Sequence, residues 1–369
     1  MYADHLVLPW YDRVVEDLPD APVFDAHTHL GAHDPSSITA TYDELVTAVD
    51  VARARALVFP LSEPDGYREA NAACIDAAAR SDGRLTALVR VVPDEVDAVE
   101  DHLAAGARGI KLHLSSDEVS LDDPRLEPAL AAADERRLPV VVHAGPEVSS
   151  TGRSVLATCE RWSGLRLVLA HCGLSDLGRL HRRVQDVDNL FFDTSWWTPA
   201  HLMALFRLVP PGRVLAASDL PYSTPVSGLM STARCAWQAG LDPTQVASVL
   251  GAQAARLVDG LEPLDVGGAP SQEARPVGPF LEVASTNLLA ALEGMQRGLE
   301  PEVPLTVARH ACDVAEDDPD AEVLASVLQL LDLYEEHRER LPRRNSFTPG
   351  WDLVSAAAVV ARTPAAPLP

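Results

Sequence analysis

The sequence is short of cysteine and of basic residues. Its five cysteines are scattered and odd in number, and they include no CxxC pair, a pattern that fits reduced thiols rather than a disulfide framework. Only 30 Lys and Arg residues stand against 54 Asp and Glu residues, which gives a formal net charge of −24. A field of that sign repels phosphate backbones and anionic lipids, so the composition argues against nucleic-acid and membrane partners.

Long apolar runs and nucleotide-binding motifs are also missing. No stretch approaches the roughly 18 consecutive apolar residues of a membrane span. Residues 1–5 contain neither the basic nor the apolar region of a secretory signal, so we expect a cytoplasmic protein. No GxGxxG or GxxxxGK(S/T) motif follows a strand-like segment, which removes the usual nucleotide-binding folds.

What the sequence does contain is a regular alternation of short β-branched runs and helix-like stretches. Residues 138–142 and 165–170 are almost continuously apolar, as in strands that are buried on both faces of a parallel sheet. Eight such units in about 200 residues predict an α/β fold, a (β/α)8 TIM barrel, rather than an open doubly wound sheet. The predicted strands comprise residues 23–29, 56–60, 85–92, 109–114, 139–144, 165–172, 189–195 and 214–219.

The composition changes near Leu264, where a segment rich in Gly and Pro begins. Such a segment is typical of a linker, and the residues beyond it show helical spacing, clearest between Val323 and Tyr334. We therefore predict a helical C-terminal extension that supplies no barrel strand and ends in a loose tail over residues 363–369. The predicted boundaries are an N-terminal segment (1–22), the barrel (23–263), the linker (264–279) and the extension (280–369).

Four histidines and one aspartate lie at the ends of predicted strands, where this fold builds its active sites. The i, i+2 spacing of His27 and His29 places both imidazoles on one side of a strand. Later strands end in His143, His171 and Asp219. One histidine at a strand end is more often a hydrogen-bonded core residue. Five such side chains around one mouth instead predict a site for one or two divalent cations, with zinc as the expected metal.

This ordered set of strand-end residues resembles that of the amidohydrolase superfamily. The resemblance is closest to the amidohydrolase-2 branch, which includes enzymes like aminocarboxymuconate-semialdehyde decarboxylase, and it covers roughly residues 20–260. It implies that the metal ligands are His27, His29, His143, His171 and Asp219. It also implies that Asp219 accepts the proton of a metal-activated water, while His171 holds a second ion, or orients the water and polarises the carbonyl.

The predicted strand 109–114 adds Lys111 and His113, which share one strand face by the same i, i+2 rule. In binuclear members of the superfamily a lysine on this strand is carboxylated and bridges two metal ions, so Lys111 would be a further ligand. The segment is also similar to the Gly-x-Lys-x-His pattern of urease, whose histidine contacts substrate. The alternative is a free ammonium that pairs with an acid such as Glu63 or with a carboxylate of the substrate.

Residues in the loops after the strands are expected to shape a pocket for a small-molecule substrate. Besides His113, the candidates are Glu63, Trp196 and Tyr222. Aromatic residues in such loops often line a pocket, although packing between loops is their commoner role.

Two reactions fit these residues. The first is hydrolysis of an amide, ester, lactone or related C–N or C–O bond by metal-activated water. The second is non-oxidative decarboxylation of an aromatic or unsaturated carboxylic acid. A metal-stabilised structural protein fits less well, because a closed structural zinc site needs no base such as Asp219. The sequence does not name the substrate, and it leaves assembly into a homo-oligomer open.

Overall fold

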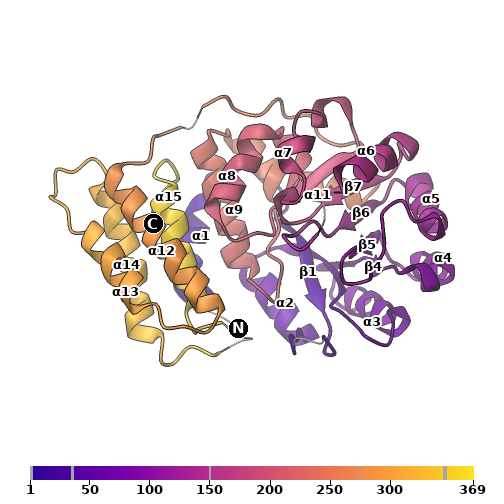
Figure 1. Ribbon diagram of the computed structural model, residues 1–369, viewed down its shortest axis with the longest axis horizontal. Coiled ribbons are helices and arrows are strands. Elements are labelled where there is room, and N and C mark those ends of the chain that lie inside the picture. Colours follow the sequence, from indigo (N-terminus) through magenta and orange to yellow (C-terminus); the bar gives the residue numbers. More distant parts are fainter. Residues whose placement is uncertain (1–2, 35–36, 149–150, 273, 344–346) are drawn as a thin grey trace.

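Short parallel strands form the core of the part of the chain that the computed structural model describes, residues 3–34, 37–148, 151–272, 274–343 and 347–369 (Figure 1). The strands are β1 (Phe24–Leu30), β2 (Arg55–Pro60), β3 (Leu85–Ala87), β4 (Val89–Arg90), β5 (Ile110–Leu112), β6 (Pro139–Val142), β7 (Arg166–Leu169), β8 (Leu190–Asp193) and β9 (Val214–Leu215). Each of the eight predicted strands is present, but the one predicted over residues 85–92 is divided at Leu88 into β3 and β4.

Backbone hydrogen bonds join these strands into a ring. Regular pairing gives the orders β1-β2-β3 and β4-β5-β6-β7-β8-β9. At one seam, the N–H of Leu88 donates to the carbonyl of Val58 at 2.9 Å. At the other, the N–H of Ala26 donates to the carbonyl of Ala216 at 2.8 Å, and the N–H of Asp219 donates to the carbonyl of His27 at 2.9 Å. The predicted (β/α)8 TIM barrel is confirmed.

Helices cover the outside of the ring. They are α2 (Tyr42–Val51), α3 (Arg68–Ala79), α4 (Val99–Ala104), α5 (Glu127–Arg136), α6 (Gly152–Arg161), α7 (Leu177–Leu180), α8 (Pro199–Leu208), α9 (Pro225–Ala239) and α10 (Pro243–Ala247). Local sequence fixes where some of them begin. At α2, the Thr41 side chain accepts from the N–H of Glu44, and the Glu44 carboxylate accepts from the N–H of Thr41, which is a capping box.

Strand residues alternate between two apolar layers. Ile110 and Leu112 of β5 pack in the layer between strands and helices, which turns Lys111 into the barrel. The interior is filled by large side chains from six strands, namely Phe24, Phe59, Val141, Val168, Phe191 and Leu215. Leu257 of α11 (Gln253–Val258) packs on the same cluster. Because that cluster includes the first residue of β1, α11 closes the N-terminal end of the barrel and leaves the other end for a site.

The chain beyond the barrel is helical and lies against one side of it (Figure 1). It contains α12 (Pro279–Gln296), α13 (Glu302–Ala311), α14 (Ala321–His337) and α15 (Trp351–Arg362). Here α15 packs against α12, α14 and α9, and α1 (Asp4–Val15) packs against α9 and α15. Both ends of the chain therefore meet at α9, the helix that follows β9.

The C-terminal tail differs from its prediction. Thr363 is fully buried and Ala366 is almost so, and the buried Arg234 of α9 holds this segment. Its guanidinium donates to the Thr363 hydroxyl at 3.0 Å and to the carbonyl of Pro367 at 2.8 Å. Residues 363–369 are thus a packed part of the fold, not a loose tail.

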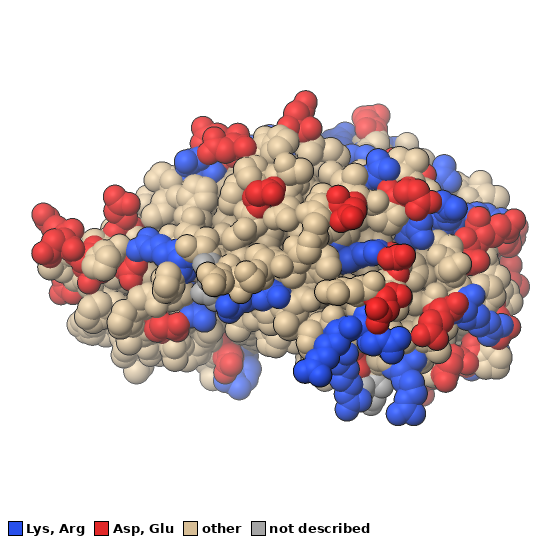
Figure 2. All heavy atoms as spheres, turned by 90° about the horizontal axis from the view of Figure 1, so that it is seen from above, with Lys and Arg blue, Asp and Glu red and all other residues tan. Residues whose placement is uncertain are grey.

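Acidic and basic side chains lie near one another over much of the face in Figure 2, and acidic ones gather at the end formed by the C-terminal helices. The described residues include no helix that is both long and apolar enough to cross a membrane.

Candidate metal centre

An irregularity in β1 turns two of the predicted ligands, His27 and His29, toward the barrel interior. Between Asp25 and Thr28 the register of β1 against β2 shifts by one residue, which is a β-bulge. A bulge changes which side chains face inward beyond it. Ala26 therefore packs in the barrel interior, yet His27 directly after it also faces the interior, followed by His29. Both imidazoles are buried at the open end of the barrel.

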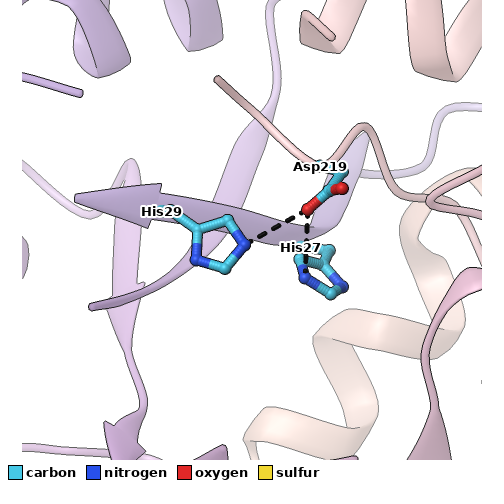
Figure 3. A group of neighbouring side chains, drawn as sticks. All are labelled: His27, His29 and Asp219. Carbon is cyan, nitrogen blue, oxygen red and sulfur yellow. Dashed lines mark hydrogen bonds and ion pairs between the residues drawn. The ribbon is translucent and has the colours of Figure 1, made fainter. Parts of the chain in front are cut away.

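Asp219 lies between these two imidazoles. Its Oδ1 atom is 3.2 Å from His29 Nε2 and 3.3 Å from His27 Nε2, and its carboxylate points at both rings (Figure 3). Its backbone adopts a left-handed φ of 64°. Gly228 lets α9 support this segment, because a Cβ there would lie only 2.6 Å from Ser218 Cα.

Asp193, the last residue of β8, contacts His27 and the backbone segments that follow β7 and β8. Its Oδ2 atom is 2.8 Å from His27 Nδ1, and its Oδ1 atom accepts from the N–H of His171 and of Ser195, each at 3.0 Å. Because a carboxylate only accepts, His27 carries its proton on Nδ1 and turns the Nε2 lone pair toward Asp219. Asp193 is not among the residues that the sequence predicts. A carboxylate at the end of an apolar strand was the signal that could have found it.

The Lys111 side chain reaches the same group of residues from β5. Its Nζ atom lies 3.4 Å from His27 Nε2 and 4.7 Å from the centre of the Phe59 ring. Burial lowers the pKa of Lys111 to about 8, which increases the share of neutral amine, the form that reacts with carbon dioxide to give a carbamate. Lys111 is the only lysine in the sequence.

A second group of ligand-type atoms lies beside the first. His171, whose φ is 55°, places Nε2 3.0 Å from His143 Nδ1, and the His113 ring stacks on the His143 ring with centres 3.8 Å apart. Glu147 contacts His143 Nε2 and forms, with His113 and His143, a group that could hold a metal ion. The ring centres of His171 and His27 are 5.2 Å apart, so the two groups lie next to each other. Glu147, too, is absent from the sequence prediction.

Burial keeps the imidazoles neutral. It lowers the pKa of His29 to about 3 and lowers the pKa values of His27, His143 and His171 as well. The neutral imidazole is the form that coordinates a metal. Burial raises the pKa of the Asp219 carboxyl to about 7, and a cation beside it would favour the ionised form instead.

The predicted substrate-contact residues divide into two groups. Trp196 and Tyr222 lie next to the ligands, with ring centres 6.1 Å from His171 and 6.3 Å from His29. Glu63 lies farther out, where its carboxylate is 2.8 Å from Nδ1 of the exposed His33. The ion pair that Glu63 makes within the described residues is with His33 and not with Lys111.

The family of the chain follows from a family model described as Amidohydrolase, which matches residues 24–260. The match covers more than half of the chain, so this chain belongs to the amidohydrolase family, as its strand-end residues predict. The matched range contains β1 to β9, while α12 to α15 lie beyond it. No curated protein sequence matches the chain significantly.

Solved structures show the same fold. An amidohydrolase from Burkholderia multivorans with bound zinc is 16% identical, with a TM-score of 0.52 over 65% of this chain and 99% of that one. An uncharacterised TIM-barrel protein from Bordetella bronchiseptica is 13% identical, with a TM-score of 0.51 over 65% and 99% of the two chains. A mutant form of the 5-carboxyvanillate decarboxylase of Novosphingobium aromaticivorans, with bound manganese, is 12% identical, with a TM-score of 0.51 over 65% of this chain and 97% of that one.

Proposed function

We propose that this chain is a metal-dependent hydrolase that cleaves an amide, ester, lactone or related C–N or C–O bond of a small molecule. The observation that carries the proposal is the convergence of His27 Nε2 and His29 Nε2 on one oxygen of Asp219 at the open end of the barrel. Membership of the amidohydrolase family supports it.

The donor atoms fit a divalent cation, with zinc as the proposed metal. Two neutral imidazole nitrogens and a carboxylate oxygen are ligands that zinc prefers, and a catalytic zinc keeps a further position open. The hydrogen bond from His27 Nδ1 to Asp193 leaves Nε2 free to coordinate. His143 and His171, with Lys111 if it is carboxylated, would hold a second ion. A bound cation supplies Lewis acidity and lowers the pKa of a water molecule toward neutrality.

The chain's own residues then accept, hold and transfer protons. Asp219 accepts a proton from the attacking water as the water oxygen bonds to the carbonyl carbon. It passes that proton to the leaving nitrogen or oxygen as the C–N or C–O bond breaks. His171 Nδ1 lies 2.7 Å from the carbonyl of Ser195, so it carries the proton and Nε2 is a lone-pair donor. This tautomer suits His171 as a ligand or as an acceptor that orients water, not as a donor to the substrate carbonyl.

Decarboxylation of an aromatic or unsaturated acid is the second candidate function. Two observations favour it: the aromatic side chains beside the site, and the shared fold of the 5-carboxyvanillate decarboxylase. A panel of esters, amides, lactones and aromatic acids, assayed for carboxylate release and for carbon dioxide release, separates the two reactions.

Metal analysis combined with Asp219→Asn tests the proposal. Protein purified without chelator should hold one or two equivalents of a transition metal. Asp219→Asn should keep much of that metal and lose roughly 10²- to 10⁴-fold in kcat, because the amide cannot accept the proton. Exposed Asp265→Asn serves as the control. A chain that binds no transition metal even after reconstitution, or an Asp219→Asn variant with wild-type turnover, contradicts the proposed function.

A further inference from the structure

A cavity of about 240 Å³ lies beside Asp219, between the loops after β8 and β9 and the C-terminal helices. Its wall includes Trp196 and Trp197 after β8, and Phe347 and Trp351 from the extension. An apolar cavity of roughly 150 Å³ holds a benzene molecule. This cavity therefore has room for one ring with a small substituent.

Four aromatic side chains form a continuous row along this cavity. The ring centres of Phe347 and Trp351 are 5.5 Å apart, those of Trp351 and Trp197 are 5.9 Å apart, and those of Trp197 and Trp196 are 6.3 Å apart. Trp196 in turn lies 6.1 Å from the His171 ring. The row thus leads from the C-terminal helices to the candidate metal ligands. Rings in such a row favour another flat ring, which can stack on them or meet them edge to face.

Three residues of the wall carry a buried hydrogen-bonding group that has no partner within the described part of the chain. These groups are Nε1 of Trp196, Nε1 of Trp351 and Oγ of Ser227. Trp351 is 7% exposed and Ser227 is 5% exposed, so bulk solvent does not readily compensate them. Buried polar groups are nearly always paired in native proteins. All three belong to residues of the wall, so a small rotation of one of these side chains on binding would let it donate to an acceptor atom on a bound ring.

Charge narrows the class of ligand further. Asp219 is the one charged side chain among the described residues of the wall, which also includes several serines. In the part of the cavity away from Asp219, a carboxylate would have no positive side chain to compensate its lost hydration. The cavity therefore suits an uncharged ring.

Part of this wall lies outside the family region. The family match ends at residue 260, whereas Trp351 and Ser355 lie one helical turn apart on α15 and both line the cavity. We propose that α15, together with Phe347 shortly before it, completes the substrate site, and that the aromatic row binds an uncharged planar ring bearing a hydrogen-bond acceptor. The position of the reacting bond beside Asp219 rests on the proposed function, but binding of the ring needs no metal.

Benzamide is a suitable probe, because it is a neutral planar ring with a carbonyl acceptor. Cyclohexanecarboxamide is the matched control, with the same acceptor on a ring that is not flat. Three of the six tryptophans line the cavity, so tryptophan fluorescence and saturation-transfer NMR report on binding without turnover. Both ligands are titrated into the full-length protein, as purified and after removal of metal with EDTA.

We expect benzamide to bind more tightly than cyclohexanecarboxamide in both preparations. Trp351→Leu should weaken benzamide binding by about tenfold, because this substitution removes both the aromatic ring and the N–H donor. Trp351→Phe should weaken it by a smaller factor, because it loses the donor alone, and Trp162→Phe, outside the cavity, should change nothing. Equal affinity for the two probes, or a folded Trp351→Phe and Trp351→Leu pair that binds benzamide like wild type, overturns the assignment. Such a result leaves the metal content and the effect of Asp219→Asn untouched, so the two proposals fail separately.

Discussion

The carboxylate of Asp193, at the end of β8, lies 2.8 Å from Nδ1 of the His27 imidazole on β1. Both side chains are fully buried, so the contact is not weakened by solvent. It fixes the position of the His27 proton and the direction of the Nε2 lone pair. The same carboxylate accepts from the backbone N–H of His171, so one residue orients parts of both groups of candidate ligands.

Replacing Asp193 should therefore weaken metal binding although Asp193 is not placed as a ligand. For Asp193→Asn we expect a loss of about 10- to 100-fold in metal affinity, which is typical when a partner of a ligating histidine is removed. Competition with a fluorescent zinc chelator measures this affinity. Exposed Asp188→Asn, in the turn just before β8, is the control. Unchanged affinity in a folded Asp193→Asn variant would show that the contact does not orient a ligand.

Lys111 allows an unusually clean chemical test, because no other lysine is present. If Lys111 is carboxylated, protein exchanged into ¹³C-bicarbonate should show one carbamate carbonyl signal that is absent in Lys111→Ala. That variant should also lose the second metal ion and activity, and short carboxylic acids should restore part of both by replacing the carbamate. If Lys111 is a free ammonium, the signal is absent, Lys111→Ala keeps its metal, and substrate affinity falls.

Arg234 should control the attachment of the C-terminal tail. Arg234→Met removes the donors that reach Thr363 and Pro367 and leaves buried carbonyls without partners, at a cost of about 2 kcal/mol. We expect a lower unfolding midpoint in urea and earlier removal of residues 363–369 by carboxypeptidase. Exposed Arg297→Met should behave like wild type. A tail that resists digestion equally in both variants would contradict this role.

Asp352 predicts a stability that depends on pH. Its carboxylate accepts from the N–H of Ala3 at 2.6 Å, and burial raises its pKa from 3.8 to about 6. A carboxyl with a raised pKa holds its proton longer in the folded state. The stability that it contributes is therefore present at low pH and is lost as the pH rises from about 4 through about 6. The full effect of such a shift is roughly 3 kcal/mol.

Asp352→Asn should remove this dependence, because the amide still accepts from Ala3 but cannot ionise. Calorimetric midpoints of wild type and variant should converge near pH 4 and separate above about pH 6, with the variant more stable. Asp4, also buried and with a pKa raised by burial, is repelled by the Asp352 carboxylate, so part of the difference reports on this pair. Midpoints that run parallel across this range would contradict the assignment, and exposed Asp332→Asn is expected to run parallel to wild type.

The strands and the strand-end histidines could be predicted because their signals are local. Apolar runs identify the strands, and the two-residue period places Lys111 and His113 on one face. Alternation alone could not show that both Ala26 and His27 face inward, because the β-bulge depends on how β1 pairs with β2. Nor could it show the contact between Asp193 and His27, which spans 166 residues and exists only once the ring closes.

The prediction of a loose C-terminal tail was wrong for a different reason. A short segment of Pro and Ala has the composition of a mobile end, and its burial depends on Arg234, a residue of a distant helix. The aromatic row could not be predicted for the same reason, because Trp197 and Trp351 meet only where the extension packs on the barrel. Contacts between segments far apart in the sequence leave no periodic signal in it.

His171 and Asp219 both hold left-handed backbone conformations, with φ of 55° and 64°. For residues other than glycine this conformation costs about 1 kcal/mol or more, less for Asp than for His. The loops that carry the reactive groups are therefore kept in place by the scaffold against their own preference. Selection for heat resistance alone would favour glycine at position 171 and would discard the imidazole. At these two positions, stability to heat and turnover should place opposite demands on the sequence, and a more stable variant is best sought away from the loops that carry them.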